Sequence, residues 1–121
     1  MADEADFFWL KVKTIGKVTV AQITLGNLWK EEKVEALAAE IVHLIDDLGV
    51  AQLVLDLGEV AGLGSRMIGQ LAALHRQVTA AGGRLVLCRL QPQAAEVIET
   101  CRLTEVFHVY PDEQTAVQSF T

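Results

Sequence analysis

The spacing of apolar positions changes along the chain. The patterns over its first 48 residues predict a β-hairpin followed by a helix. Residues 7–12 contain aromatic and β-branched residues with some alternation, and β-branched residues return over residues 18–25. Gly16 lies between the two segments and is expected to make a turn, so we predict a β-hairpin. From residue 31 to residue 48, apolar residues fall three and four positions apart, which is typical of an amphipathic helix. Gly49 is expected to end that helix.

Short apolar runs and helical patterns alternate over the rest of the chain. Continuous apolar runs at residues 53–55 and 85–87 are typical of strands buried in a parallel sheet. We predict helices over about residues 65–81, from Pro92 onwards and after the capping residue Asp112, with a last short strand at residues 106–110. The resulting order, β-β-α-β-α-β-α-β-α, predicts one α/β domain over the whole chain, with a mixed, mostly parallel β-sheet.

Composition and charge fit a single domain over residues 1–121 and exclude several classes of function. The net charge is −6, and lysines and arginines form no basic cluster, so we expect no nucleic-acid partner. The acidic residues 1–6 lack the features of a signal peptide and are expected to be a flexible N-terminus. No apolar run approaches the length of a membrane span, so we expect no membrane insertion and a cytoplasmic location.

The residue types that most often carry chemistry show no catalytic or metal-binding spacing. Cys88 and Cys101 are too far apart for a CxxC motif, and we predict that both are small buried hydrophobic residues. The histidines form no metal-ligand or catalytic-triad pattern, so we expect no metal site, no cofactor and no enzymatic activity. Trp9 is expected in the core, whereas Trp29 is a candidate for a surface that contacts a partner.

The loop that enters the second predicted helix is the main candidate for a functional site, because partners of parallel sheets meet the carboxyl ends of the strands. Asp56 ends an inner strand and is expected to hydrogen-bond the loop backbone, and Gly62 allows close approach of the backbone. Ser65 is predicted to be the helix N-cap. Arg66 then lies in the first turn, where the helix dipole disfavours a cation, so it is either simply solvated or grips an anion or an acidic partner.

Two ligand-binding interpretations of this loop do not fit its residues well. Gly62 and Gly64 supply the first two glycines of a dinucleotide-binding motif, but Met67 stands at the third position. Asp56 ends a strand as the phosphate acceptor of a receiver domain does, but the carboxylate pair and the lysine of a receiver are missing. A small anion- or nucleotide-sensing site that uses backbone N–H groups and Arg66 stays open as an alternative.

The same loop also has the composition of a protein-docking patch. Leu63 and Met67 are apolar and are set among small and charged residues, and methionine and arginine are enriched at interfaces. We therefore expect an exposed patch that binds a protein partner, formed by Leu63, Gly64, Ser65, Arg66 and Met67.

Four segments resemble the STAS domains of anti-sigma factor antagonists. They are residues 53–57, the turn into residues 68–71, residues 80–88 and residues 97–107. The element order derived above is also that of the family. The resemblance implies a protein-interaction module in signal transduction and transcription regulation, whose partner is an anti-sigma factor or a serine-kinase-like ATPase. It leaves the oligomeric state open.

The resemblance also bears on regulation. Antagonists of this family carry Asp-Ser-Ser-Gly or Asp-Ser-Thr-Gly before the second helix. A partner serine kinase phosphorylates the second hydroxyl residue of this motif. The unmodified antagonist binds the kinase, and this binding releases a sigma factor. The matching positions here are Gly64, Ser65, Arg66 and Met67. Arg66 stands at the acceptor position without a hydroxyl, which implies docking without phosphorylation there. Phosphorylation of Ser65 is the alternative, and it would add about −1.5 to −2 charges at a helix N-terminus.

Overall fold

The chain opens with an antiparallel hairpin. The computed structural model describes residues 7–28 and 31–120. Strands β1 (Leu10–Ile15) and β2 (Val18–Ile23) pair with Ile15 opposite Val18. Gly16 makes the turn with a φ of +63°, a conformation that costs glycine little because it has no Cβ. The predicted hairpin is confirmed.

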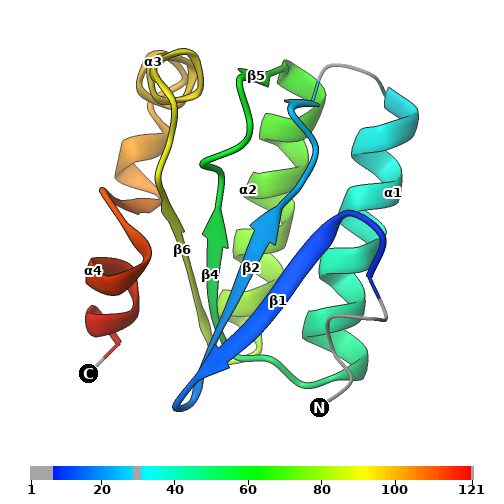
Figure 1. Cartoon of the computed structure of the whole chain (residues 1–121), viewed down its shortest axis with the longest axis vertical. Coiled ribbons are helices and arrows are strands. Elements are labelled where there is room, and N and C mark those ends of the chain that lie inside the picture. Colours follow the sequence, from blue (N-terminus) through cyan, green and yellow to red (C-terminus); the bar gives the residue numbers. More distant parts are fainter. Residues whose placement is uncertain (1–6, 29–30, 121) are drawn as a thin grey trace.

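Parallel strands and helices alternate after the hairpin, as the spacing of apolar residues predicts (Figure 1). The five-stranded sheet has the order β1-β2-β4-β6-β7, and every pair except β1–β2 is parallel. The single α/β domain with a mixed, mostly parallel sheet is therefore confirmed. The further strands of this sheet and the α-helices are β4 (Gln52–Asp56), β6 (Arg84–Cys88), β7 (His108–Tyr110), α1 (Glu31–Val42), α2 (Ser65–Ala80), α3 (Pro92–Thr100) and α4 (Glu113–Gln118).

Helices cover the two faces of the sheet unequally. The larger core lies between one face and helices α1 and α2, which run side by side behind the strands in Figure 1. On the other face, Ala116 of α4 packs against a smaller group of buried residues that includes Val20, Val54 and Val86. A strand that is covered on both faces has apolar residues at consecutive positions, and this is why β4 and β6 could be predicted from their continuous apolar runs.

Four short elements in the described part of the chain were not predicted from the sequence. Strands β3 (Asn27–Leu28) and β5 (Gly62–Leu63) pair in parallel and form a second, two-stranded sheet. A π-helical turn, η2 (His43–Asp47), continues α1 up to Gly49, whose φ is +69°. A 3₁₀ turn, η3 (Leu103–Glu105), precedes β7, so the last strand is shorter than predicted.

The structure tests the remaining predictions for single residues. Cys88 is buried, as predicted, and burial raises the pKa of its thiol to about 12. Cys101 is exposed, so that prediction is wrong: α3 ends at Thr100, and the following residue leaves the helical register. Trp9 is half-buried against the core. Trp29 and residues 1–6 lie outside the described residues, and no helix in the described part of the chain is long and apolar enough to cross a bilayer.

Candidate functional site

Backbone hydrogen bonds fix the start of α2. The N–H of Ala61 donates to the carbonyl of Gly26 at 2.8 Å, and the N–H of Gly64 donates to the carbonyl of Leu28 at 3.2 Å. The N–H of Leu63 donates to the side-chain oxygen of Gln93 on α3 at 2.9 Å. The loop before α2 is therefore attached both to the β3 segment and to α3, and Gly62 lies buried in β5 opposite Asn27.

Three residues of the predicted docking patch, Leu63, Gly64 and Met67, are not at the surface. Leu63 is 1% exposed and Met67 is 0% exposed, so the expected exposed apolar patch is wrong. Leu63 is buried because β5 pairs with β3 and packs against α3. Met67 lies on the same side of α2 as Leu71 and Leu74, and that side faces the core.

The structure also corrects the predicted helix cap. The N-cap of α2 is Gly64, which is buried and extended with a φ of −98° and a ψ of 172°, and no side chain caps the helix. Ser65 is the first residue of α2 and is exposed.

The exposed side of α2 begins at Ser65. A shallow depression in this surface is lined by Ser65, Arg66, Gly69, Gln70 and Ala73, which we call the α2 face. The Nη2 atom of Arg66 lies 2.7 Å from the Oε2 atom of Glu35 on α1. Arg66 is therefore a surface cation that is bound to a carboxylate of the neighbouring helix.

Asp56 has the structural role that the sequence predicts. Its carboxyl group is 0% exposed, and its Oδ1 atom accepts a hydrogen bond from the N–H of Gly58 at 2.8 Å. Its Oδ2 atom accepts a hydrogen bond from the guanidinium of Arg89 at 3.2 Å. The predicted hydrogen bond to the loop backbone is confirmed.

Glu113 completes a charged group around Asp56 that sequence reasoning missed. Burial raises the pKa of Asp56 to about 6, and its interaction with the carboxyl group of Glu113 raises it further. The same interaction lowers the pKa of Glu113, and Lys13 on β1 adds to that effect with its Nζ atom 2.9 Å from the Oε1 atom of Glu113. Since Glu113 begins α4, its ion pair with Lys13 links the last helix to β1.

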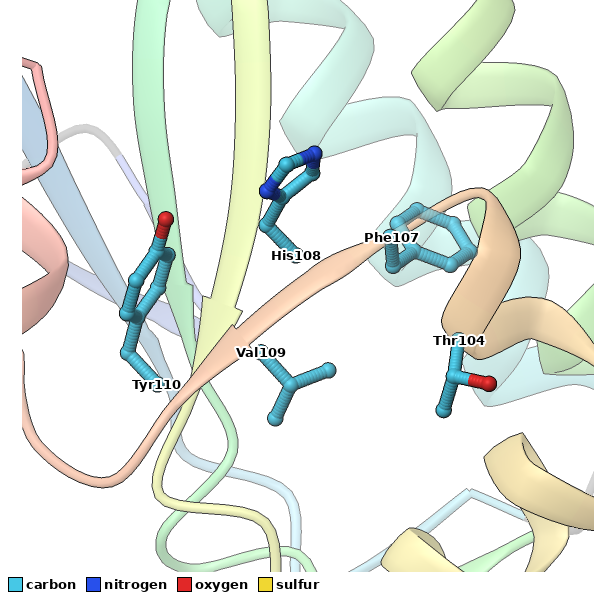
Figure 2. A pocket seen from close by; sticks show the side chains of 5 residues that line it. All are labelled: Thr104, Phe107, His108, Val109 and Tyr110. Carbon is cyan, nitrogen blue, oxygen red and sulfur yellow. The ribbon is translucent and has the colours of Figure 1, made fainter.

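A hollow of about 320 Å³ lies at the other edge of the sheet, beside β7 (Figure 2). It is lined by Thr104, Phe107, His108, Val109 and Tyr110, and the His75 ring packs edge-on against Phe107 with ring centroids 5.2 Å apart. Within residues 7–28 and 31–120, no group of three or more histidine, cysteine, aspartate or glutamate side chains could hold a metal ion.

Comparisons with known proteins agree with this architecture. A family model described as the STAS domain matches residues 19–116. BtrV of Bordetella bronchiseptica, named as a candidate anti-sigma factor antagonist, is 31% identical over 86 residues, which are 71% of this chain and 73% of BtrV. The structure of an anti-sigma factor antagonist from Mycobacterium paratuberculosis is 24% identical and has a TM-score of 0.80 over 91% of each chain. The phosphorylated form of Bacillus SpoIIAA is 18% identical, with a TM-score of 0.70 over 93% of this chain and 99% of SpoIIAA.

Proposed function

Because the chain belongs to the STAS domain family, in the anti-sigma factor antagonist type, we propose that it binds an anti-sigma factor or a serine-kinase-like ATPase through the α2 face. Proteins of this type are non-catalytic regulators, so the function is the contact itself. The observation that carries the proposal is a row of small, exposed residues that begins at the start of α2, beside the loop at the carboxyl end of β4.

The spacing of the small residues suits contact with another helix. Ser65, Gly69 and Ala73 are four residues apart, so they lie along one line of α2, and all three are exposed. The distance between two packed helices depends on the side chains between them. A partner helix can therefore approach this line closely, with Arg66 and Gln70 at its border.

Arg66 supplies charge at the border of this surface. Its ion pair with Glu35 is exposed on both sides, and exposed pairs of this kind stabilise a protein by at most about 1 kcal/mol. Exchanging Glu35 for a carboxylate of a partner therefore costs little. We propose that Arg66 contributes to the choice of an acidic partner surface.

The residue at the usual phosphoacceptor position is Arg66, which has no hydroxyl group. We therefore propose that docking is not switched by phosphorylation at that position. Incubation with candidate serine kinases and ATP, followed by mass spectrometry of the peptide that holds residues 62–69, tests this proposal. We expect no phosphate in that peptide; phosphate on Ser65 would replace the proposal with its alternative.

The alternative of a small anion or nucleotide sensor would use the same helix N-terminus. It gains no support from Arg66, whose guanidinium already contacts Glu35. A calorimetric titration with ATP, GTP and sulfate separates the two functions. We expect no heat of binding at the α2 face.

The docking surface is tested with a substitution that the fold tolerates. A Cβ atom at Gly69 would meet no atom within 4 Å, so Gly69→Glu places a charged side chain on the α2 face without disturbing the core. Thr79→Glu, at an exposed position near the other end of α2, is the matched control.

The partner is first identified by capture from host lysate and then purified for calorimetry. We expect Gly69→Glu to weaken binding at least tenfold and Thr79→Glu to change it less than twofold, with similar melting temperatures for both variants. If Gly69→Glu bound as tightly as the unmodified protein, the docking surface would lie elsewhere.

A further inference from the structure

The outer side of β1 forms a second candidate contact surface. We propose that this strand binds an extended, acidic segment of a partner protein as an added β-strand. β1 stands at the end of the strand order, so no strand within the described residues pairs with its outer side (Figure 1). The site is separate from the α2 face, and the inference does not depend on the function proposed for that face.

The hydrogen bonds of the hairpin show which backbone groups point outwards. The carbonyl of Trp9 accepts a hydrogen bond from the N–H of Thr24 at 2.9 Å, and the register of β1 with β2 continues without a bulge to the turn. In an antiparallel pair, every second residue bonds across to the neighbouring strand. The N–H and C=O groups of Leu10, Val12 and Thr14 therefore face outwards, and no described residue outside the strand pairs with them. Such a row of groups is a template for an added strand.

The charge around β1 differs in sign from that of the whole protein. Residues 7–30 contain four lysines and no aspartate or glutamate, although the net charge of the chain is −6. One of these lysines, Lys13, is paired with Glu113 on α4. Lys11 and Lys17 on the hairpin and Lys33 on α1 are exposed. This local positive charge attracts an acidic segment. The same charge opposes pairing with β1 of a second copy, because the lysines of the two strands would repel each other.

An exposed aromatic side chain lies beside the start of β1. Phe8 is 77% exposed and packs edge-on against Trp9, with ring centroids 4.4 Å apart. The backbone N–H groups of both residues donate to the carboxylate of Glu40 on α1, at 2.8 and 2.9 Å. The Nζ atom of Lys33 lies 5.7 Å from the centre of the Trp9 ring. Phe8 is thus held in place before any partner arrives, which lowers the entropy lost on binding.

These features together define the segment that fits. It is extended, about six residues long, and carries carboxylates opposite the lysines of the hairpin and an apolar side chain against Phe8. A labelled hexapeptide that alternates glutamate with valine and phenylalanine serves as the probe. The same peptide with lysine in place of glutamate is its control.

Binding is measured by fluorescence anisotropy with the full chain. We expect the acidic peptide to bind at least tenfold more tightly than the lysine peptide and to weaken as salt concentration rises. Lys11→Glu with Lys17→Glu, both at exposed positions, should reduce binding of the acidic peptide at least tenfold. Gly69→Glu should leave it unchanged, because that residue belongs to the α2 face.

The position of the peptide is read from backbone amide signals in NMR spectra. We expect the amides of Leu10, Val12 and Thr14 to shift and to become protected from hydrogen exchange. Equal affinity for the two peptides would overturn the proposal, as would shifts confined to residues 62–69. One further result would overturn it: the unmodified protein does not bind the acidic peptide, and the variant with both lysines replaced aggregates. The lysines would then serve only to prevent aggregation through the unpaired edge of β1.

Discussion

Asp56 makes the stability of this protein depend on pH. In the unfolded chain its carboxyl group has an ordinary pKa of 3.8, whereas in the folded protein burial and the interaction with Glu113 raise the pKa to about 6. Between these two values the folded state keeps a proton that the unfolded state has released. The free energy of unfolding therefore falls as the pH rises from about 4 to above 6.

The size of the effect follows from the two pKa values. A difference of one between the folded and unfolded pKa corresponds to 1.36 kcal/mol, so the rise from 3.8 to about 6 corresponds to about 3 kcal/mol. Glu113 acts in the opposite direction. Its pKa is lowered in the folded protein, so its contribution is present above its ordinary value of 4.5 and is lost as the pH falls below it. Burial lowers the pKa of His75, so this side chain also contributes between pH 5 and pH 7.5. The effect of Asp56 is therefore read as the difference between the unmodified protein and a variant that lacks this carboxyl group.

The substitution Asp56→Asn removes the titrating group and keeps its shape. An amide oxygen can accept the hydrogen bond from the N–H of Gly58 as the carboxyl oxygen does. Arg89 loses an ion-pair partner, but its side chain is partly exposed, which limits the cost.

Urea denaturation at several pH values between 5 and 7.5 measures the result. We expect the unmodified protein to lose about 1.4 kcal/mol of stability relative to Asp56→Asn across this range, because part of the total effect lies below pH 5. Glu99→Gln, at an exposed position on α3, is the control, and its profile should run parallel to that of the unmodified protein. Parallel profiles for Asp56→Asn and the unmodified protein would refute the reasoning, as would an NMR titration of the Asp56 carboxyl carbon with a midpoint below pH 4.5.

Two further predictions concern packing and reactivity. A Cβ atom at Gly83 would overlap the carbonyl oxygen of Ala51, so Gly83→Ala should lower the free energy of unfolding by about 2 kcal/mol or more. A Cβ atom at Gly69 would lie in open space on a helix, so Gly69→Ala should raise the free energy of unfolding by about 0.5–1 kcal/mol. Denaturation curves that rank the two variants the other way would contradict this packing. Iodoacetamide at pH 8 should label Cys101 in the folded protein and Cys88 only after unfolding, as mass spectrometry of the peptides can show, because Cys88 is buried and the pKa of its thiol is about 12.

The sequence by itself determined the order of the main elements and the fold class. Helical spacing up to residue 48, a positive-φ glycine at Gly49, and the continuous apolar runs of β4 and β6 are local features, and each survives in the structure. The hydrogen bond from the Gly58 N–H to Asp56 is also local, since it spans two residues. Such features can be read from sequence because neighbours along the chain supply most of their energy.

Only the tertiary structure decided which side chains reach the surface of the candidate site. Leu63 is buried because residues 62–63 pair with residues 27–28, and Met67 is buried because α2 turns that side to the core. Glu113 meets Asp56 because α4 packs on the second face of the sheet. Periodicity tells which residues share one side of a helix or strand, but not which distant segment covers that side, because that contact is made by residues far apart in the chain.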